Sequence, residues 1–99
     1  MNQIKRIEEM EEKLNIANKT IKNLEKALKE YSNSQEDIRE LAAYYASDEW
    51  KKDFEADEKG MLPNDLKRGV LSEDGIYNML DKNIEVQRKM CRTIEKSIR

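Results

Sequence analysis

Histidine is absent from the 99-residue sequence, and cysteine and proline each occur once. Without histidine, the chain lacks the most common general base and the most common zinc ligand. The single cysteine, Cys91, has no partner for a disulfide within the chain, which favours a reduced, cytoplasmic setting. It also has no histidine to activate it as a nucleophile, so we expect a buried structural cysteine. These shortages predict a protein that is not an enzyme and that holds no cofactor.

Aromatic residues are also scarce, at 6%, whereas charged residues make up 40% of the chain. A small chain buries a limited share of its surface, and this composition supports only a thin core. Pairing of helices, within the chain or between chains, is the expected remedy. No apolar run is long enough to span a bilayer, and the first dozen residues contain no apolar signal core. We therefore expect one helical domain over residues 1–99, with no membrane association.

The net charge of −2 is unevenly distributed. Residues 1–31 carry seven bases and six acids (+1), residues 32–66 four bases and ten acids (−6), and residues 67–99 eight bases and five acids (+3). The acidic middle and the basic C-terminal third are expected to attract each other within one fold or one oligomer. The alternative is a face offered to a charged partner. The overall charge does not favour nucleic-acid binding.

A regular apolar stripe follows the N-terminal arm, residues 1–31. Its members alternate spacings of three and four, and we call them the arm stripe: Ile7, Met10, Leu14, Ala17, Ile21, Leu24, Leu28 and Tyr31. This spacing is the a/d pattern of a coiled coil, and no glycine or proline interrupts it. The larger members are candidates for an oligomer seam: Ile7, Met10, Leu14, Ile21, Leu24 and Leu28. Beside the stripe, Arg6 and Glu11 would attract across a parallel dimer, while the other flanking pairs are neutral. The flanks thus permit a parallel dimer without specifying one.

The Ser-Asn-Ser segment 32–34 predicts a break or tight turn, because Ser34 and Asp37 resemble a capping box. The alternative is a kinked continuation, since apolar residues over 38–45 keep the earlier register.

Capping residues divide the central segment, residues 32–75, into short elements. We expect an amphipathic helix over about residues 35–46 and a second helix that begins at Ser47 and ends near Gly60 in the left-handed conformation. A single helical turn is predicted over residues 63–68, followed by Gly69 as its C-terminal cap. Ser72 is expected to cap the last helix.

The central segment also gathers most of the aromatic residues, which we expect to form a core where the helices meet. The alternative is a pocket for a nucleotide or another anion, with aromatic walls and positive charge from Lys67 and Arg68. The candidate ligand- or partner-binding residues are Tyr44, Tyr45, Trp50, Asp53, Lys67 and Arg68. The acids over 53–58 lack the central glycine and closing glutamate of a calcium loop. Solvated carboxylates, or ion pairs with Lys67 and Arg68, are expected there rather than a metal site.

A second stripe follows the C-terminal arm, residues 73–99, where a helix is predicted over about residues 73–97. Its members are Tyr77, Leu80, Ile84, Gln87, Cys91, Ile94 and Ile98. Gln87 and Cys91 make this stripe weaker than the first. The last turns are basic but lack the interleaved aromatic residues typical of a nucleic-acid surface.

The central run from Tyr44 to Gly75 resembles a bacterial and phage family, domain of unknown function 4298. The matching residues include Glu49-Trp50, Leu62-Pro63 and the segment 65–75, and the resemblance extends to the arm sequence RIEEMEEKLN. It covers nearly the whole chain and implies one complete domain of phage or mobile-element type. It implies no catalytic or binding residues.

The sequence therefore predicts an all-α fold, in which two long coiled-coil-like helices pack antiparallel and short central helices close one end. We expect a homodimer that acts by protein–protein interaction, as a phage or mobile-element regulator or inhibitor of a host protein. The alternative function is binding of a small anionic ligand by a pocket around Trp50, Lys67 and Arg68.

Overall fold

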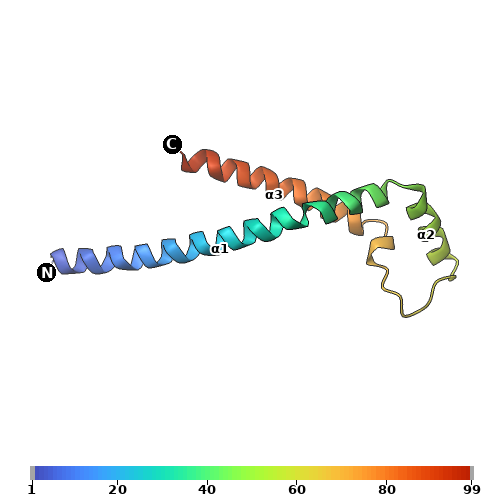
Figure 1. The fold of residues 1–99 in the computed structure, drawn as a ribbon, viewed down its shortest axis with the longest axis horizontal. Helices are drawn as coiled ribbons and strands as arrows, with labels where there is room; N and C mark the ends of the chain where they lie inside the picture. The colour runs from blue at the N-terminus through green and yellow to red at the C-terminus, as the bar shows by residue number, and fades with distance from the viewer. Residues whose placement is uncertain (1, 99) are drawn as a thin grey trace. The chain divides into compact units, whose positions relative to one another are not determined.

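The computed structural model describes residues 2–98, and within them every regular element is helical. Helix α1 spans Asn2–Tyr45, α2 spans Asp48–Glu58, the 3-10 turn η1 spans Gly69–Leu71, and α3 spans Gly75–Ser97 (Figure 1). The chain divides into an N-terminal unit, Met1–Glu36, and a C-terminal unit, Asp37–Arg99. The all-α prediction is confirmed, while the antiparallel packing of the two long helices stays a prediction.

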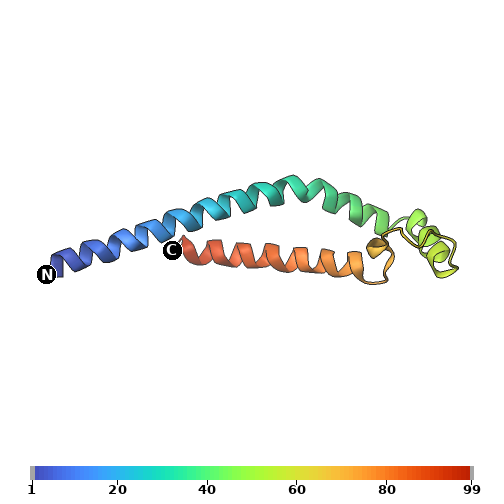
Figure 2. The same ribbon diagram turned by 90° about the horizontal axis from the view of Figure 1, so that it is seen from below.

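The break predicted at residues 32–34 is wrong, because α1 continues through this segment (Figure 2). The Ser34 hydroxyl donates to the Tyr31 carbonyl oxygen at 2.9 Å, and the Gln35 side-chain amide donates to the same oxygen at 3.2 Å. Both bonds return to the preceding turn, so Ser34 does not cap a new helix. The separate helix predicted over 35–46 is the C-terminal part of α1.

Both ends of α2 are capped as predicted. The Ser47 hydroxyl accepts the Trp50 backbone N–H at 3.3 Å. This bond satisfies one of the free donors at the helix start. At the other end, Gly60 takes the left-handed conformation with φ of 69°. Its N–H bonds the Asp57 carbonyl, and the Met61 N–H bonds the Ala56 carbonyl. This is a Schellman motif, in which a glycine reverses the chain and satisfies the last carbonyls.

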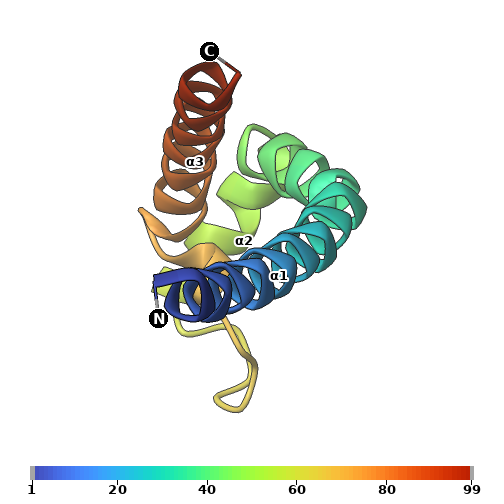
Figure 3. The ribbon, with the colours of Figure 1, turned by 90° about the vertical axis from the view of Figure 1, so that its left-hand side faces the viewer.

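The helical turn predicted over residues 63–68 is wrong. The Leu66 N–H bonds the Pro63 carbonyl at 3.2 Å in an isolated turn, and Gly69 begins η1 instead of capping a helix. The Pro63 and Leu66 carbonyls also accept hydrogen bonds from the Arg68 side chain, which takes the place of helical backbone bonds. Residues 59–68 form a loop that projects from the helices of the C-terminal unit (Figure 3).

Ser72 is not the N-cap of α3, contrary to the prediction, because the helix begins at Gly75 with Asp74 at its N-cap position and no side chain caps it there. The Ser72 hydroxyl accepts the Gly75 N–H at 3.0 Å and donates to the Gly69 carbonyl at 2.9 Å. A Cβ at position 75 would lie only 2.6 Å from that carbonyl oxygen and would also contact the Ser72 hydroxyl. Glycine is therefore required at Gly75 for the close approach of η1 to α3.

The core of the C-terminal unit is thin. Only two described residues are buried, Leu71 in η1 and Ile76 in the first turn of α3, at 6% and 3% exposure. The half-buried residues of α3 are Met79, Leu80, Asn83 and Met90. Most of the predicted α3 stripe lies on another face and is exposed, including Tyr77, Ile84, Ile94 and Ile98. Cys91 is also exposed, so the expectation that it is buried is wrong for the single chain.

Candidate functional site

The arm stripe is open to solvent along the N-terminal part of α1. Every residue from 2 to 30 is exposed. The exposed fractions of the six predicted seam residues are Ile7 53%, Met10 52%, Leu14 54%, Ile21 64%, Leu24 55% and Leu28 45%. A contiguous apolar stripe of this kind, rimmed by charged side chains, is a candidate interaction surface.

The same heptad register continues along α1 into the C-terminal unit, where it is covered. Ile38, Ala42 and Tyr45 occupy the next apolar positions and are half-buried. Leu41 beside them lines a hollow together with Ile76 of α3. Because α1 is unbroken, the stripe is continuous. Its C-terminal part is packed within the C-terminal unit, and its N-terminal part is exposed.

The aromatic residues of the central segment hold the C-terminal unit together. The Tyr45 and Trp50 rings meet edge to face, with centroids 5.0 Å apart, and Phe54 stacks on Trp50 at 5.1 Å. The Trp50 indole N–H donates to the Val70 carbonyl at 2.8 Å, and the Tyr45 hydroxyl donates to the Glu73 carbonyl at 3.2 Å. These rings therefore connect α1, α2, η1 and the approach to α3. Their contacts agree with the predicted core role.

Tyr44 and Asp53, two further predicted site residues, form a pair. The Tyr44 hydroxyl donates to the Asp53 carboxylate at 2.6 Å and so joins the end of α1 to α2. Burial, the hydrogen bond and the negative charge of Asp53 together raise the pKa of Tyr44 to about 12. The pair is therefore a neutral phenol bonded to a carboxylate at physiological pH, which suits a structural link between two helices.

Arg68 is bound within the loop. Its Nη1 lies 2.7 Å from the Asp57 carboxylate, so the predicted pairing of an acid in 53–58 with Arg68 is confirmed. Its Nη2 donates to the Pro63 carbonyl at 2.9 Å, and its Nε donates to the Leu66 carbonyl at 3.3 Å. One planar guanidinium thereby links α2 to two points of the loop. An anionic ligand at Arg68 would have to compete with these acceptors.

Lys67 lies elsewhere, at a mostly apolar hollow of about 470 Å³ in the C-terminal unit. The lining residues are Leu41, Lys67, Gly69, Val70, Gly75, Ile76 and Met79. The structure thus groups Tyr45 with Trp50, Tyr44 with Asp53 and Arg68 with Asp57, and places Lys67 at this hollow. The anion-binding alternative stays a prediction, and these contacts do not assemble its three residues into one pocket.

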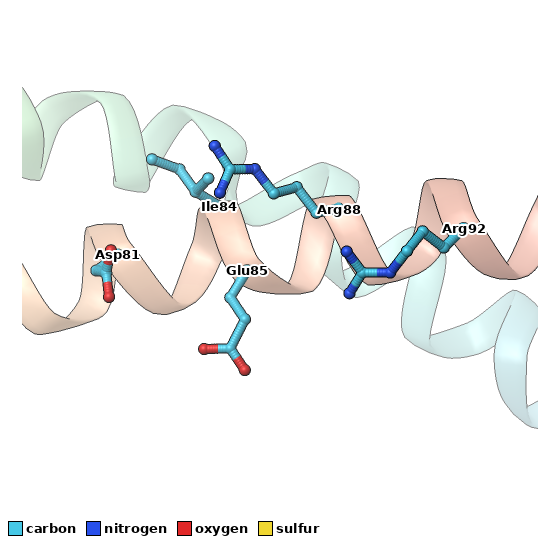
Figure 4. Close-up of a pocket in the computed structure, with 5 residues that line it drawn as sticks. All are labelled: Asp81, Ile84, Glu85, Arg88 and Arg92. Atoms are coloured by element: carbon cyan, nitrogen blue, oxygen red, sulfur yellow. The ribbon is translucent and has the colours of Figure 1, made fainter.

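A smaller hollow of about 280 Å³ lies on α3 alone (Figure 4). Arg88 and Arg92 extend from the helix there, and Glu85 points away from both. Because all the lining residues come from one helix, this hollow has no opposite wall. It is an open surface that carries two acids, Asp81 and Glu85, as well as the two arginines, and these arginines belong to the predicted basic end of the chain.

Two features are absent from residues 2–98. No group of three or more acidic or cysteine side chains is arranged there to hold a metal ion. Among the described helices, none combines the length and the apolar character needed to cross a membrane.

The fold and its exposed surfaces define a small all-α protein with an exposed arm stripe and a C-terminal unit held together by aromatic contacts. The family model described as "Domain of unknown function (DUF4298)" matches residues 7–93, and the chain belongs to this family. The match begins at Ile7, the first residue of the arm stripe, and includes the loop and most of α3. No curated protein and no solved structure matches the chain significantly.

Proposed function

We propose that the chain is a non-enzymatic, cytoplasmic homodimer that works through protein–protein contacts and regulates another protein. The observation that supports this proposal is the exposed arm stripe, whose six large apolar side chains are each about half exposed in the single chain. A second copy offers the same stripe and is always present at equal concentration. Self-pairing is therefore the simplest way to remove this surface from water.

The energetics agree with self-pairing. Full burial of a large aliphatic side chain contributes about 1.5–3 kcal/mol. Six half-exposed side chains from each of two chains, twelve in all, would then contribute about 9–18 kcal/mol. Association costs about 4–15 kcal/mol in lost translational and rotational freedom. The stripe is thus large enough to support a dimer, and too small to guarantee a very tight one.

The contacts of the predicted ligand-binding residues favour protein–protein contact over the anion-binding alternative, because these side chains are used to hold the fold. Trp50 is bonded to η1, and Tyr44 is bonded to Asp53. Arg68 is bonded to Asp57 and to the loop backbone. An anion would have to compete with these contacts within the C-terminal unit.

The test is the mass of the protein in solution. The wild type is expected to sediment as twice the 11.7 kDa chain mass. Leu14→Asn with Leu24→Asn places polar groups in the stripe and is expected to give a monomer. Ile16→Asn is the matched control, because Ile16 is 58% exposed but lies off the stripe, and it should leave the dimer intact. A wild type that sediments at the mass of one chain, or a double variant that remains dimeric, would contradict the proposal.

A further inference from the structure

We propose that the two copies of α1 pair in parallel and in register along the arm stripe. The inference rests on the proposed homodimer and specifies the occupant of the exposed surface: the same segment of a second chain, running in the same direction. Three features of the structure and sequence carry it. They are the width of the stripe, the charges beside it, and the point at which its own chain begins to cover it.

The stripe has the width of a two-stranded seam. Only the a and d positions of each heptad are regularly apolar, whereas helices in larger bundles also bury a third position per heptad. The flanking e and g positions of the arm from Arg6 onward are mostly polar: Arg6, Glu11, Lys13, Asn18, Thr20, Glu25 and Ala27. Because residues 2–30 of α1 are helical and exposed, these side chains are available to flank a partner helix.

Parallel pairing in register brings a g residue of one chain beside the following e residue of the other. Arg6 then faces Glu11 of the second copy, and by symmetry this attraction occurs twice. The remaining flanking contacts, such as Lys13 with Asn18 and Thr20 with Glu25, involve at most one charge. Parallel pairing therefore has two favourable charge pairs and no unfavourable one.

Antiparallel pairing of the same eight positions is less favourable. It stacks Ile7 on Tyr31 and Leu14 on Leu24 of the partner, and it places Glu11 beside the partner's Glu25. This repulsion also occurs twice, and no attraction balances it. Shifting the chains by one heptad in either direction separates the glutamates but leaves two stripe residues of each chain without a partner.

A longer antiparallel overlap would bring Glu11 to Arg39 of the second copy. It would also require the stripe positions over 38–45, which are half-buried within the C-terminal unit. Leu41 beside them lines the hollow shared with Ile76 and Met79. Because only the arm part of the stripe is exposed, pairing is limited to the arm. There the parallel arrangement has the more favourable charge pairs. Parallel pairing also makes both chains leave the paired arm at the same end.

Disulfide trapping distinguishes the two orientations. Met10→Cys, in a Cys91→Ser background, places a single thiol in the stripe. In the parallel dimer the two thiols face each other, and we expect oxidised glutathione to convert most of the dimer into a covalent one. In the eight-position antiparallel dimer they lie 18 residues apart along the axis, about 27 Å, which no disulfide spans. Lys19→Cys on the outer face is the control and should not cross-link.

An antiparallel dimer would give a different cross-linking pattern. Antiparallel pairing places position 10 beside position 28 of the partner. A mixture of Met10→Cys and Leu28→Cys chains would then cross-link, while neither chain would do so alone. That outcome would overturn the parallel arrangement and leave the homodimer standing. A wild type that is monomeric in sedimentation would instead contradict the homodimer itself.

A charge reversal at position 11 tests the orientation independently, because it should change the dimer Kd in opposite directions in the parallel and antiparallel dimers. Glu11→Lys faces Arg6 in the parallel dimer and is expected to raise the dimer Kd about 3- to 10-fold at low salt. In the antiparallel dimer it would face Glu25 and lower the Kd. Arg6→Glu combined with Glu11→Lys should restore the parallel dimer. Glu12→Lys makes the same charge change on the outer face and should leave the Kd within about 2-fold. Tighter pairing of the Glu11→Lys variant would overturn the inference.

Discussion

At the scale of single residues, the guanidinium of Arg68 gives the loop over 59–68 its conformation. The loop contains no regular element. Without Arg68 the Leu66 carbonyl would be left to water, and the Pro63 carbonyl would keep only its bond from the Leu66 N–H. The Asp57 carboxylate, on the last turn of α2, orients the guanidinium at 2.7 Å. Both side chains are about one quarter to one third exposed, so the ion pair is only partly screened by solvent.

Arg68→Lys is expected to lower the free energy of unfolding by about 1–2 kcal/mol. The ammonium keeps the charge, but it cannot hold the Asp57 carboxylate and two carbonyls in one plane. Urea denaturation followed by Trp50 fluorescence would measure the change. Lys67→Gln is the control, because Lys67 is exposed. It should change the free energy of unfolding by at most about 0.5 kcal/mol. Equal stability of Arg68→Lys and the wild type would show that the charge alone is sufficient.

Tyr44 predicts a dependence of stability on alkaline pH. Its pKa is raised to about 12 in the folded chain, mainly by burial and also by Asp53, from a value of 10.0 in the absence of the fold. Below pH 10 both states hold the phenol proton, and the contribution of Tyr44 is fully present. As pH rises from 10 towards 12, the unfolded chain releases the proton first, so the folded state loses this stability.

Tyr44→Phe removes the ionisable group and should flatten the fall in stability between pH 10 and 12. It should also remove the latest-titrating part of the tyrosinate absorbance in the near ultraviolet. Tyr77→Phe is the matched control, because Tyr77 is 58% exposed, and should retain both features. If the two variants titrated alike, the Tyr44–Asp53 contact would not persist in solution.

At the scale of elements, α1 shows how a continuous apolar register overrides weak local propensity. Serine and asparagine are only moderately unfavourable inside a helix, by less than about 1 kcal/mol each. The Ser34 hydroxyl and the Gln35 amide bond back to the Tyr31 carbonyl and stay within the helix. The apolar positions on both sides of residues 32–34 share one heptad register, which a turn at this point would separate.

Asn33 offers a test of this continuity. Asn33→Pro removes a backbone donor from the middle of α1 and is expected to cost about 3 kcal/mol, with loss of helical circular dichroism. Asn33→Ala, at the same position, should raise helix stability by about 0.5 kcal/mol. If residues 32–34 formed a turn, proline would be tolerated there and alanine would bring no gain. An unchanged thermal melt of the proline variant would therefore contradict the continuous helix.

At the scale of the whole molecule, the sequence was sufficient for features set by local chemistry. The all-α class follows from composition and heptad spacing, and the Ser47 cap and the Gly60 Schellman motif follow from side-chain and backbone preferences. Of the features set by tertiary contacts, the pairing of Arg68 with an acid in 53–58 was predicted, but others were missed. The loop over 63–68 depends on Arg68, whose carbonyl partners lie in an irregular segment, and the Tyr44–Asp53 bond depends on how α2 leaves α1. Likewise, the buried face of α3 is chosen by η1, through Leu71 and Ile76, and not by the most regular apolar spacing.

The thin core makes the stability of the whole molecule depend on assembly. Because only two residues of the described chain are buried and the arm stripe is exposed, folding of the arm and dimerisation should be linked. The Tm is therefore expected to rise with protein concentration, by about 3–6 °C for each tenfold increase, since mass action favours the dimer. The variant Leu14→Asn with Leu24→Asn should have a lower Tm that does not change with protein concentration. The Tm of Ile16→Asn should still rise with concentration. Calorimetry at a series of concentrations measures both. A wild-type Tm that is constant over a hundredfold range would mean that the arm is stable without a partner.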